Sequence, residues 1–458
     1  MSNHKKSLQE HFGANHIYRV KFSSLRKNSA EILSAINTEQ TSISSLNTLE
    51  GDGESATLEL NLFANSRQAA LAALETLKSG GAEIQEFTDL VEESRLGGII
   101  EVKSKKKIES LTDLRMVYTP GVAAACKAIV ESPEAVSRVT GICSRVAIVS
   151  DGTAVLGLGD IGAQASMPVM EGKAAIFSEF VGISGVPIVL DTKKPDEIIE
   201  TVKHISPSFG AIQLEDIAAP ACFEIEQELD GMLDIPVFHD DQHATATVVL
   251  AALINAVKIT EKKPADCSAI IIGAGAAGYA ITKILLEYGI NNIVVYDAGG
   301  AIYRGREEQM NPYTQEIAEL TNPNNISGGL EEGFKGRDIF IGVARPDIVS
   351  EDMVSSMADK PIVFPLSNPK GEISVEKALE AGAAVCADGR TINNALAFPG
   401  IFRGALDSGI KSINAGMKLA AAQSLASQSE GNMLLPDMID RNVHKKVAKA
   451  VFDAAAKS

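Results

Sequence analysis

The spacing of apolar residues changes along the chain and separates its beginning from the rest. Residues 16–22 alternate apolar and polar side chains, which predicts a strand. The same reading predicts a helix, two strands, a helix and a last strand, in that order, at residues 29–37, 42–49, 54–64, 66–79 and 82–87. The turn Gly51-Asp52-Gly53 separates the second and third strands. This β-α-β-β-α-β order predicts a ferredoxin-like domain over residues 1–92.

Further along, short apolar strands alternate with helical stretches. The strand candidates are residues 146–149, 187–190, 210–214, 237–238, 269–272 and 292–296. Such alternation predicts parallel sheets with crossover helices, so the fold class is α/β. Residues 88–110 are charged and are predicted to form a linker, while residues 245–259 read as a long helix. We therefore expect two α/β domains and a helical tail, at residues 93–254, 255–399 and 400–458.

One glycine-rich turn carries a specific chemical signal. The strand at 269–272 runs into Gly273-Ala-Gly275-Ala276-Ala-Gly278, a GxGxxG pattern, and a helix follows. Gly273 permits the tight turn, Gly275 lets the backbone approach a pyrophosphate, and Gly278 lets the helix pack on the strand. The next strand ends in Asp297, whose carboxylate suits ribose hydroxyls and favours NAD over NADP. A glycine-rich structural turn is the alternative, and two arginines near Asp297 leave NADP open.

Two pairs of acids follow neighbouring apolar strands. Glu215 and Asp216 come after residues 210–214, and Asp240 and Asp241 come after residues 237–238. The carboxyl ends of parallel strands meet at one edge of a sheet, where α/β proteins bind ligands. Oxygen ligands from such a cluster suit Mg²⁺ or Mn²⁺. For either pair taken alone, a helix cap or a solvated surface is the favoured interpretation.

Three further residue types have both a chemical and a plain structural reading. His239 and His243 are four residues apart, as in a zinc protease motif, but Asp240 stands where that motif has Glu, so a hydrogen-bonded structural histidine is favoured. Lys173 sits among small and apolar residues, where a lysine can act as a base, although an exposed lysine is the common case. Tyr118 precedes a Pro-Gly turn that would expose its phenol, but taken alone it is no more than a turn aromatic.

Composition narrows the class of protein. The chain has 458 residues with a formal charge of -17 at pH 7, which disfavours binding to nucleic acid or to anionic membranes. Hydrophobic residues make up 45%, as in globular proteins, and the five cysteines show no CxxC spacing for zinc or a disulfide framework. The polar start at residues 1–12 does not have the apolar stretch of a signal peptide. These features predict a cytoplasmic protein.

Several motifs together resemble one family. They occur in the order YTPGV, SDGTAVLGLGDIG, PVMEGK, LEDI, HDDQHATA, GAGAAG and NNALAFPGIFRGALD. From about Asp113 to the end, the chain resembles malic enzymes of the smaller bacterial type. The resemblance implies a malic-type catalytic domain for substrate and metal at residues 93–254 and a Rossmann-type NAD(P)-binding domain at residues 255–399. The first domain of the chain resembles the ACT-like regulatory domain of one branch of that family, but the glycine expected after the first strand is missing from residues 22–25. A dimerisation domain that binds no effector is an equal alternative.

The resemblance implies oxidative decarboxylation of L-malate to pyruvate and CO₂, with a nicotinamide cofactor and Mg²⁺ or Mn²⁺. It also implies a homodimer or higher homo-oligomer. By position, Tyr118 matches the family's proton donor, Lys173 its general base and Asp240 an acid beside the metal. The matching metal ligands are Glu215, Asp216 and Asp241. Asn368 and Asn394 match residues near the substrate and the nicotinamide.

The chain departs from the family pattern at several positions, and two rival functions are compatible with the sequence. Ala244 replaces a usual glycine, Ala154 stands where a larger branch has a substrate-binding arginine, and residues 368–373 and 387–392 depart from the usual motifs. One rival is a metal-dependent oxaloacetate decarboxylase that transfers no hydride, which the intact GxGxxG turn disfavours. Another is an inactive sensor, which the retained acids, lysine and tyrosine disfavour.

Overall fold

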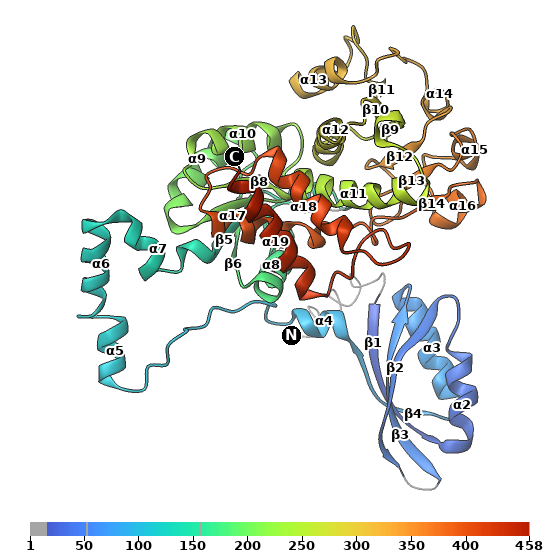
Figure 1. Ribbon diagram of the computed structural model, residues 1–458. Coiled ribbons are helices and arrows are strands. Elements are labelled where there is room, and N and C mark those ends of the chain that lie inside the picture. The colour runs from blue at the N-terminus through green and yellow to red at the C-terminus, as the bar shows by residue number, and fades with distance from the viewer. Residues whose placement is uncertain (1–15, 52–53, 156, 458) are drawn as a thin grey trace. The chain divides into compact units, whose positions relative to one another are not determined.

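The computed structural model describes residues 16–51, 54–155 and 157–457 (Figure 1). The chain divides into two compact units, residues 1–102 and 103–458, which are described separately. The polar start at residues 1–12 and most of the turn expected at Gly51-Asp52-Gly53 lie outside the described residues.

The first unit has the predicted order of elements. They are β1 (His16–Leu25), α2 (Arg26–Ala35), β2 (Thr41–Gly51), β3 (Ser55–Ala64), α3 (Arg67–Ser79) and β4 (Glu83–Asp89). The strands form an antiparallel sheet in the order β2-β3-β1-β4. Alternate side chains of β1, including Tyr18, Val20 and Phe22, are buried in a core shared with α2 and α3. The alternation of apolar and polar residues in the sequence therefore places the apolar side chains of β1 on the one buried face of this sheet.

The linker expected at residues 88–110 is wrong at its beginning. β4 continues to Asp89, and α4 (Leu90–Arg95) follows at once. The Asp89 carboxylate accepts hydrogen bonds from the backbone N–H groups of Val91 and Glu92, as an N-cap does. The acidic residues that suggested a solvated linker thus lie in the first turn of a helix, where its dipole favours negative charge.

The second unit begins with helices and a four-stranded sheet. The helices before the sheet are α5 (Leu111–Val117), α6 (Val122–Glu131) and α7 (Val136–Val139). The strands are β5 (Arg145–Ser150), β6 (Ser184–Val189), β7 (Ala211–Leu214) and β8 (Val237–His239), all parallel, in the order β6-β5-β7-β8. The helices α8 (Ala163–Val181), α9 (Pro195–Ile205) and α10 (Ala221–Met232) connect them. Because all four strands are parallel, β5, β7 and β8 end at the same edge.

The second sheet has six strands in the order β11-β10-β9-β12-β13-β14. Its strands are β9 (Ser268–Ile272), β10 (Asn292–Asp297), β11 (Gly300–Ala301), β12 (Ile339–Gly342), β13 (Ile362–Pro365) and β14 (Val385–Cys386). Its helices are α12 (Ala276–Tyr288), α13 (Pro312–Leu320), α14 (Leu330–Phe334), α15 (Glu351–Ser355) and α16 (Val375–Glu380). With β9 counted as first, this is the Rossmann order, and the strand order reverses between β9 and β12. The glycine-rich turn therefore lies at the point where such sheets bind dinucleotides.

One long helix joins the two sheets. α11 (Asp240–Ile259) packs against α12 and against α18 (Ala415–Ser427) of the tail, whose other helices are α17 (Phe398–Ser408) and α19 (Arg441–Ala455). Within the described residues, α11 is the one helix with the length and hydropathy of a membrane span, but 72% of that window is buried inside the protein. It is thus a core helix. It begins five residues before the predicted helix at 245–259, so its first turn carries Asp240 and Asp241.

Candidate active site

Three carboxylates converge at the edge of the first sheet. Glu215 and Asp216 follow β7, Asp241 lies in the first turn of α11, and ligand oxygens of all three lie within 4.8 Å of one another. Asp216 has a φ of 54°, a left-handed conformation that Asp tolerates better than most residues. Both oxygens of the buried Asp216 carboxylate have no hydrogen-bond partner among the described residues. Buried polar atoms without partners are rare, so these oxygens fit a bound divalent cation.

A buried lysine lies beside these carboxylates. Lys173 projects from α8 and is 8% exposed, so the alternative of a solvated lysine is wrong. Its Nζ lies 2.5 Å from Asp240 Oδ2 and 3.0 Å from Glu215 Oε1. Asn394 donates a hydrogen bond from Nδ2 to the same Asp240 oxygen at 2.7 Å. Four segments of the chain thus bring one ammonium, one amide and two acids together.

The cluster perturbs its own protonation. Burial and mutual repulsion raise the pKa of Glu215 well above its usual range and that of Asp216 to about 8. Burial also raises the pKa of Asp240, although Lys173 opposes it. Burial lowers the pKa of Lys173, but the charges of Asp240, Glu215 and Asp241 outweigh this and leave it above its ordinary value. Concentrated negative charge of this kind is what a divalent cation would neutralise.

Two residues that sequence reasoning missed fix the orientation of the acids. Gln213, on β7, donates from Nε2 to Glu215 Oε2 at 2.6 Å. Glu226, on α10, accepts from the backbone N–H of His239 at 2.7 Å and from the side chain of Gln242. A polar residue inside the apolar strand 211–214 was a usable signal for Gln213. Glu226 had none, because an acid on an amphipathic helix reads as solvated.

The glycine-rich turn lines a cavity of about 720 Å³. Gly273 has a φ of +113°, and a Cβ there would meet the backbone of Val343 at 2.6 Å. A Cβ on Gly278 would clash with the Gly273 carbonyl, whereas a Cβ on Gly275 would meet nothing within 4 Å. Gly275 therefore borders open space that a Cβ would occupy. Gly275 and Ala276, at the start of α12, fit the pyrophosphate of a dinucleotide.

The far end of this cavity holds a charge pair. Asp297, at the end of β10, lines the cavity, and its Oδ1 lies 2.9 Å from Arg306 Nη2. The Arg306 side chain is 5% exposed and also donates to the carbonyls of Gly300 and Ala301. The carboxylate that favours NAD thus carries its own counter-ion, which weakens its repulsion of a 2′-phosphate. The other nearby arginine, Arg304, pairs with Glu319 on the surface.

The remaining predicted residues lie in different surroundings. Asn368 follows β13, and its carbonyl oxygen is 2.7 Å from where a Cβ of Gly157 would stand, so loops of the two sheets meet there. Tyr118 caps α5 and is 66% exposed, and the hydrogen bonds recorded for it are backbone bonds within its own segment. The structure does not bring it to Lys173. The ring of His239 is buried, but within the described residues neither ring nitrogen forms a hydrogen bond, unlike the structural histidine expected there.

Comparison with known proteins agrees with this architecture. Residues 97–230 match the family model described as the malic enzyme N-terminal domain, and residues 243–456 match the malic enzyme NAD-binding domain. The chain belongs to the malic enzyme family.

Individual relatives show how similar the chain is to other members. An NAD-dependent malic enzyme of Geobacillus stearothermophilus is 50% identical over 401 residues, which are 85% of this chain and 84% of that protein. An NADP-dependent malic enzyme of Salmonella typhimurium is 40% identical over 84% of this chain and 53% of its own length. The crystal structure of an NAD-dependent malic enzyme of Thermotoga maritima has a TM-score of 0.77 at 44% identity, covering 80% of this chain and 99% of that one.

Proposed function

We propose that this malic enzyme oxidatively decarboxylates L-malate to pyruvate and CO₂ with reduction of NAD(P)⁺ and a requirement for a divalent cation. The supporting observation is the contact of Lys173 with Asp240 and Glu215 beside the carboxylates of Asp216 and Asp241. Such an arrangement provides a proton acceptor and a metal site together. The Rossmann-type sheet, with its glycine-rich turn in the same unit, supplies the cofactor site.

Each residue has a definable task in that reaction. Glu215, Asp216 and Asp241 would hold Mg²⁺ or Mn²⁺, and a bound cation would polarise the oxygens of the substrate. Lys173, positioned by Asp240, would accept the proton of the malate hydroxyl as the carbinol hydride leaves for the nicotinamide. The hydrogen bond from Asn394 to Asp240 keeps that acid directed at the lysine.

The other roles rest on position in the family motifs. Asn368 and Asn394 would contact the substrate or the nicotinamide. Tyr118 would protonate the enolate carbon that loss of CO₂ leaves, and to do so it would have to move to the site from the exposed position it has here. A Tyr118→Phe variant separates the two steps. We expect pyruvate to form more slowly, because the enolate has lost its proton donor, while hydride transfer continues. Unchanged pyruvate formation would contradict the assignment.

We also propose a cytoplasmic homodimer, with the first unit as an ACT-like regulatory or dimerisation domain. Every residue of α5 and α6, which the structure describes in full, is exposed or half-buried, and their apolar side chains favour a protein partner. The most exposed of these are Leu111, Met116 and Val130. Light scattering of the full chain, compared with a chain beginning near Gly97, tests both ideas. An identical state of assembly and identical responses to effectors would contradict a role for the first unit.

A steady-state assay tests the activity itself. The protein is incubated with L-malate, NAD⁺ or NADP⁺, and Mg²⁺ or Mn²⁺, while reduced cofactor and pyruvate are measured separately. We expect both products in equal amounts. Consumption of oxaloacetate without any reduced cofactor from malate would instead identify a decarboxylase, and loss of both activities would identify a non-catalytic protein.

A further inference from the structure

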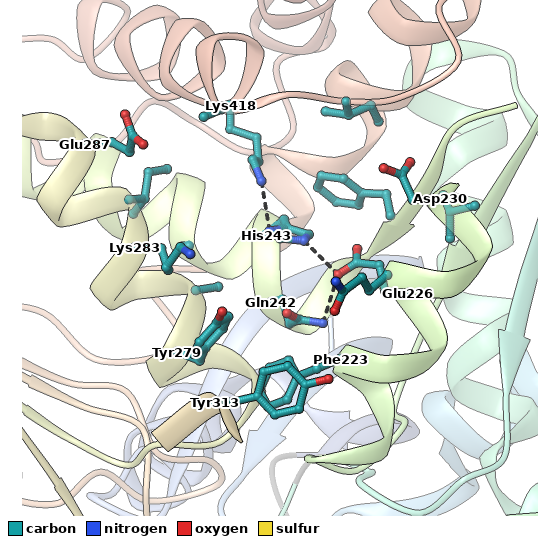
Figure 2. A pocket seen from close by; sticks show the side chains of 18 of the residues that line it. Phe223, Glu226, Asp230, Gln242, His243, Tyr279, Lys283, Glu287, Tyr313 and Lys418 are labelled. Atoms are coloured by element: carbon teal, nitrogen blue, oxygen red, sulfur yellow. Dashed lines mark hydrogen bonds and ion pairs between the residues drawn. The ribbon is translucent and has the colours of Figure 1, made fainter. Parts of the chain in front are cut away.

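Another cavity lies between α10, α11, α12 and α18, as Figure 2 shows. Its volume is about 320 Å³, within the range of pockets that hold small ligands. The aromatic rings of Phe223, Tyr279 and Tyr313 form one wall. None of the residues lining it belongs to the three-carboxylate cluster or to the glycine-rich turn. The cavity is therefore distinct from the carboxylate cluster, and it adjoins the dinucleotide cavity, with which it shares Phe223.

A cation at this cavity is not neutralised by an acid. Lys418, on α18, donates from Nζ to His243 Nδ1 at 3.2 Å, and His243 donates from Nε2 to Glu226 Oε2 at 2.9 Å. This chain of bonds fixes the histidine tautomer, because an ammonium can only donate. Within the described residues, Lys418 forms no ion pair with a carboxylate. Lys418 is half-buried, and this burial lowers its pKa.

An acid at the same cavity also has an unused oxygen. Asp230, on α10, accepts from Ser412 Oγ at 2.8 Å through Oδ2. Its Oδ1 is buried and has no hydrogen-bond partner among the described residues. Burial raises the pKa of Asp230, and the charge of Lys418 lowers it, so the two groups interact electrostatically without forming an ion pair. Lys418 and Asp230 thus both line the cavity, and each can form further hydrogen bonds with a ligand.

Two of the other charged residues at this cavity, Glu226 and Lys283, already have partners. Glu226 accepts bonds from the His239 backbone and from the side chains of Gln242 and His243. Lys283 forms an ion pair with Glu316 at 2.5 Å. Glu287 lines the cavity from α12 and adds negative charge near Lys418. A simple anion would meet this surplus of acids, whereas a zwitterion would satisfy Lys418 and Asp230 together.

We propose that this cavity binds an α-amino acid with an apolar or aromatic side chain. Its carboxylate lies against Lys418, its ammonium against Asp230, and its side chain against the rings of Phe223 and Tyr313. An α-amino acid carries both charges on one carbon, so it can bridge two groups that lie too far apart to pair directly. Aromatic rings provide the apolar contact area and prefer offset or edge contacts with another ring.

The occupant is coupled to catalysis through two shared residues. Glu226 holds the backbone of His239, which begins the segment that carries Asp240 and Asp241. Phe223 lines both this cavity and the dinucleotide cavity. A ligand that shifts α10 against α12 therefore changes the metal segment and the cofactor cavity together. The bound amino acid is an effector of malate oxidation rather than a substrate.

Calorimetric titration of the full chain with L-phenylalanine and L-leucine, without malate, tests the binding. We expect saturable binding that falls at least about tenfold in Asp230→Asn and in Lys418→Gln, because each removes one charged hydrogen bond. 3-Phenylpropionate and phenethylamine, which each have one of the two charges, should bind more weakly than phenylalanine. The exposed pair Asp234 and Lys411 provides matched controls, Asp234→Asn and Lys411→Gln, which should bind as the original protein does.

The outcomes separate this proposal from its rivals. Absence of binding to either amino acid overturns it, as does binding that survives both cavity substitutions, which would place the site elsewhere, for example in the first unit. Equal binding of phenylpropionate would indicate an anion site instead. Initial rates with and without the amino acid test the coupling: the effect should be present in the original protein and absent from Asp230→Asn. Because binding is measured without malate, its result does not depend on the proposed reaction.

Discussion

Replacement of Lys173 by Met is the sharpest test of the active site. The substitution removes the ammonium but keeps a long apolar side chain, which can still pack on Phe398, whose ring centroid is 4.6 Å from Nζ. It leaves Asp240 and Glu215 without the cation that now lies 2.5 and 3.0 Å away. The chain therefore keeps its shape at this point while losing its proton acceptor.

The size of the effect follows from the lysine's role. A positioned general base contributes about 10²–10⁴-fold to a rate, so kcat should fall by that factor in Lys173→Met. Breaking a buried ion pair costs about 3–5 kcal/mol when the remaining charge cannot adjust. Here the acids can adjust by taking up protons, because burial already raises their pKa values. The cost in stability should therefore be smaller than that figure and should grow as the pH rises.

The assay follows reduced cofactor with saturating malate and Mn²⁺, alongside thermal unfolding of the metal-free protein at two pH values. The control is Lys193→Met, because Lys193 pairs with Asp160 at 2.5 Å but is 60% exposed. An exposed pair of this kind contributes little, so the control should keep its rate and its stability. A Lys173→Met variant within threefold of the original kcat would refute the assignment of the base.

Three further predictions concern the cofactor, the metal and the Rossmann-type sheet. Arg306→Ala should lower the ratio of kcat/KM for NADP⁺ to that for NAD⁺ about tenfold, because it leaves the Asp297 carboxylate without its counter-ion. Arg304→Ala is the control. An unchanged ratio in Arg306→Ala would exclude a role for Arg306 in cofactor preference. Chelation should abolish activity, and Mn²⁺ should restore it and raise the unfolding temperature; full activity after exhaustive chelation would contradict a metal site. Asp338→Asn should destabilise the protein by about 1–3 kcal/mol in urea unfolding near neutral pH, because Asp338 holds Lys262 at 2.6 Å and the Ser268 backbone at 2.8 Å. Burial raises the pKa of Asp338, but these bonds outweigh it and lower the pKa overall. The contribution of Asp338 to stability is therefore present above its ordinary pKa and is lost as the pH falls. A difference in stability between the variant and the original protein that persists in acid would contradict this.

Local pattern was enough for the order of elements and for much of the site. Apolar runs that end in acid pairs place Glu215 and Asp241 at the edge of a parallel sheet, because side chains that follow parallel strands must share that edge. The GxGxxG spacing determines its turn, since each glycine answers a backbone constraint within a few residues. The same locality explains the error at Asp89: a charged stretch reads alike whether it is a linker or a short capped helix.

Only the folded chain decided which charges meet. Lys173 reaches Asp240 across 67 residues of sequence and Asn394 across 221, and no pattern along the chain encodes such a pairing. The same holds for the ion pair of Arg306 with Asp297 and for the contact of Glu226 with the backbone of His239. It also holds for Asp230 and Lys418, which line one cavity and form no ion pair with each other among the described residues. Sequence determines which residues stand at the end of each strand or helix. Packing of those elements decides which groups lose water together, and loss of water is what gives a lysine or a carboxylate its altered chemistry.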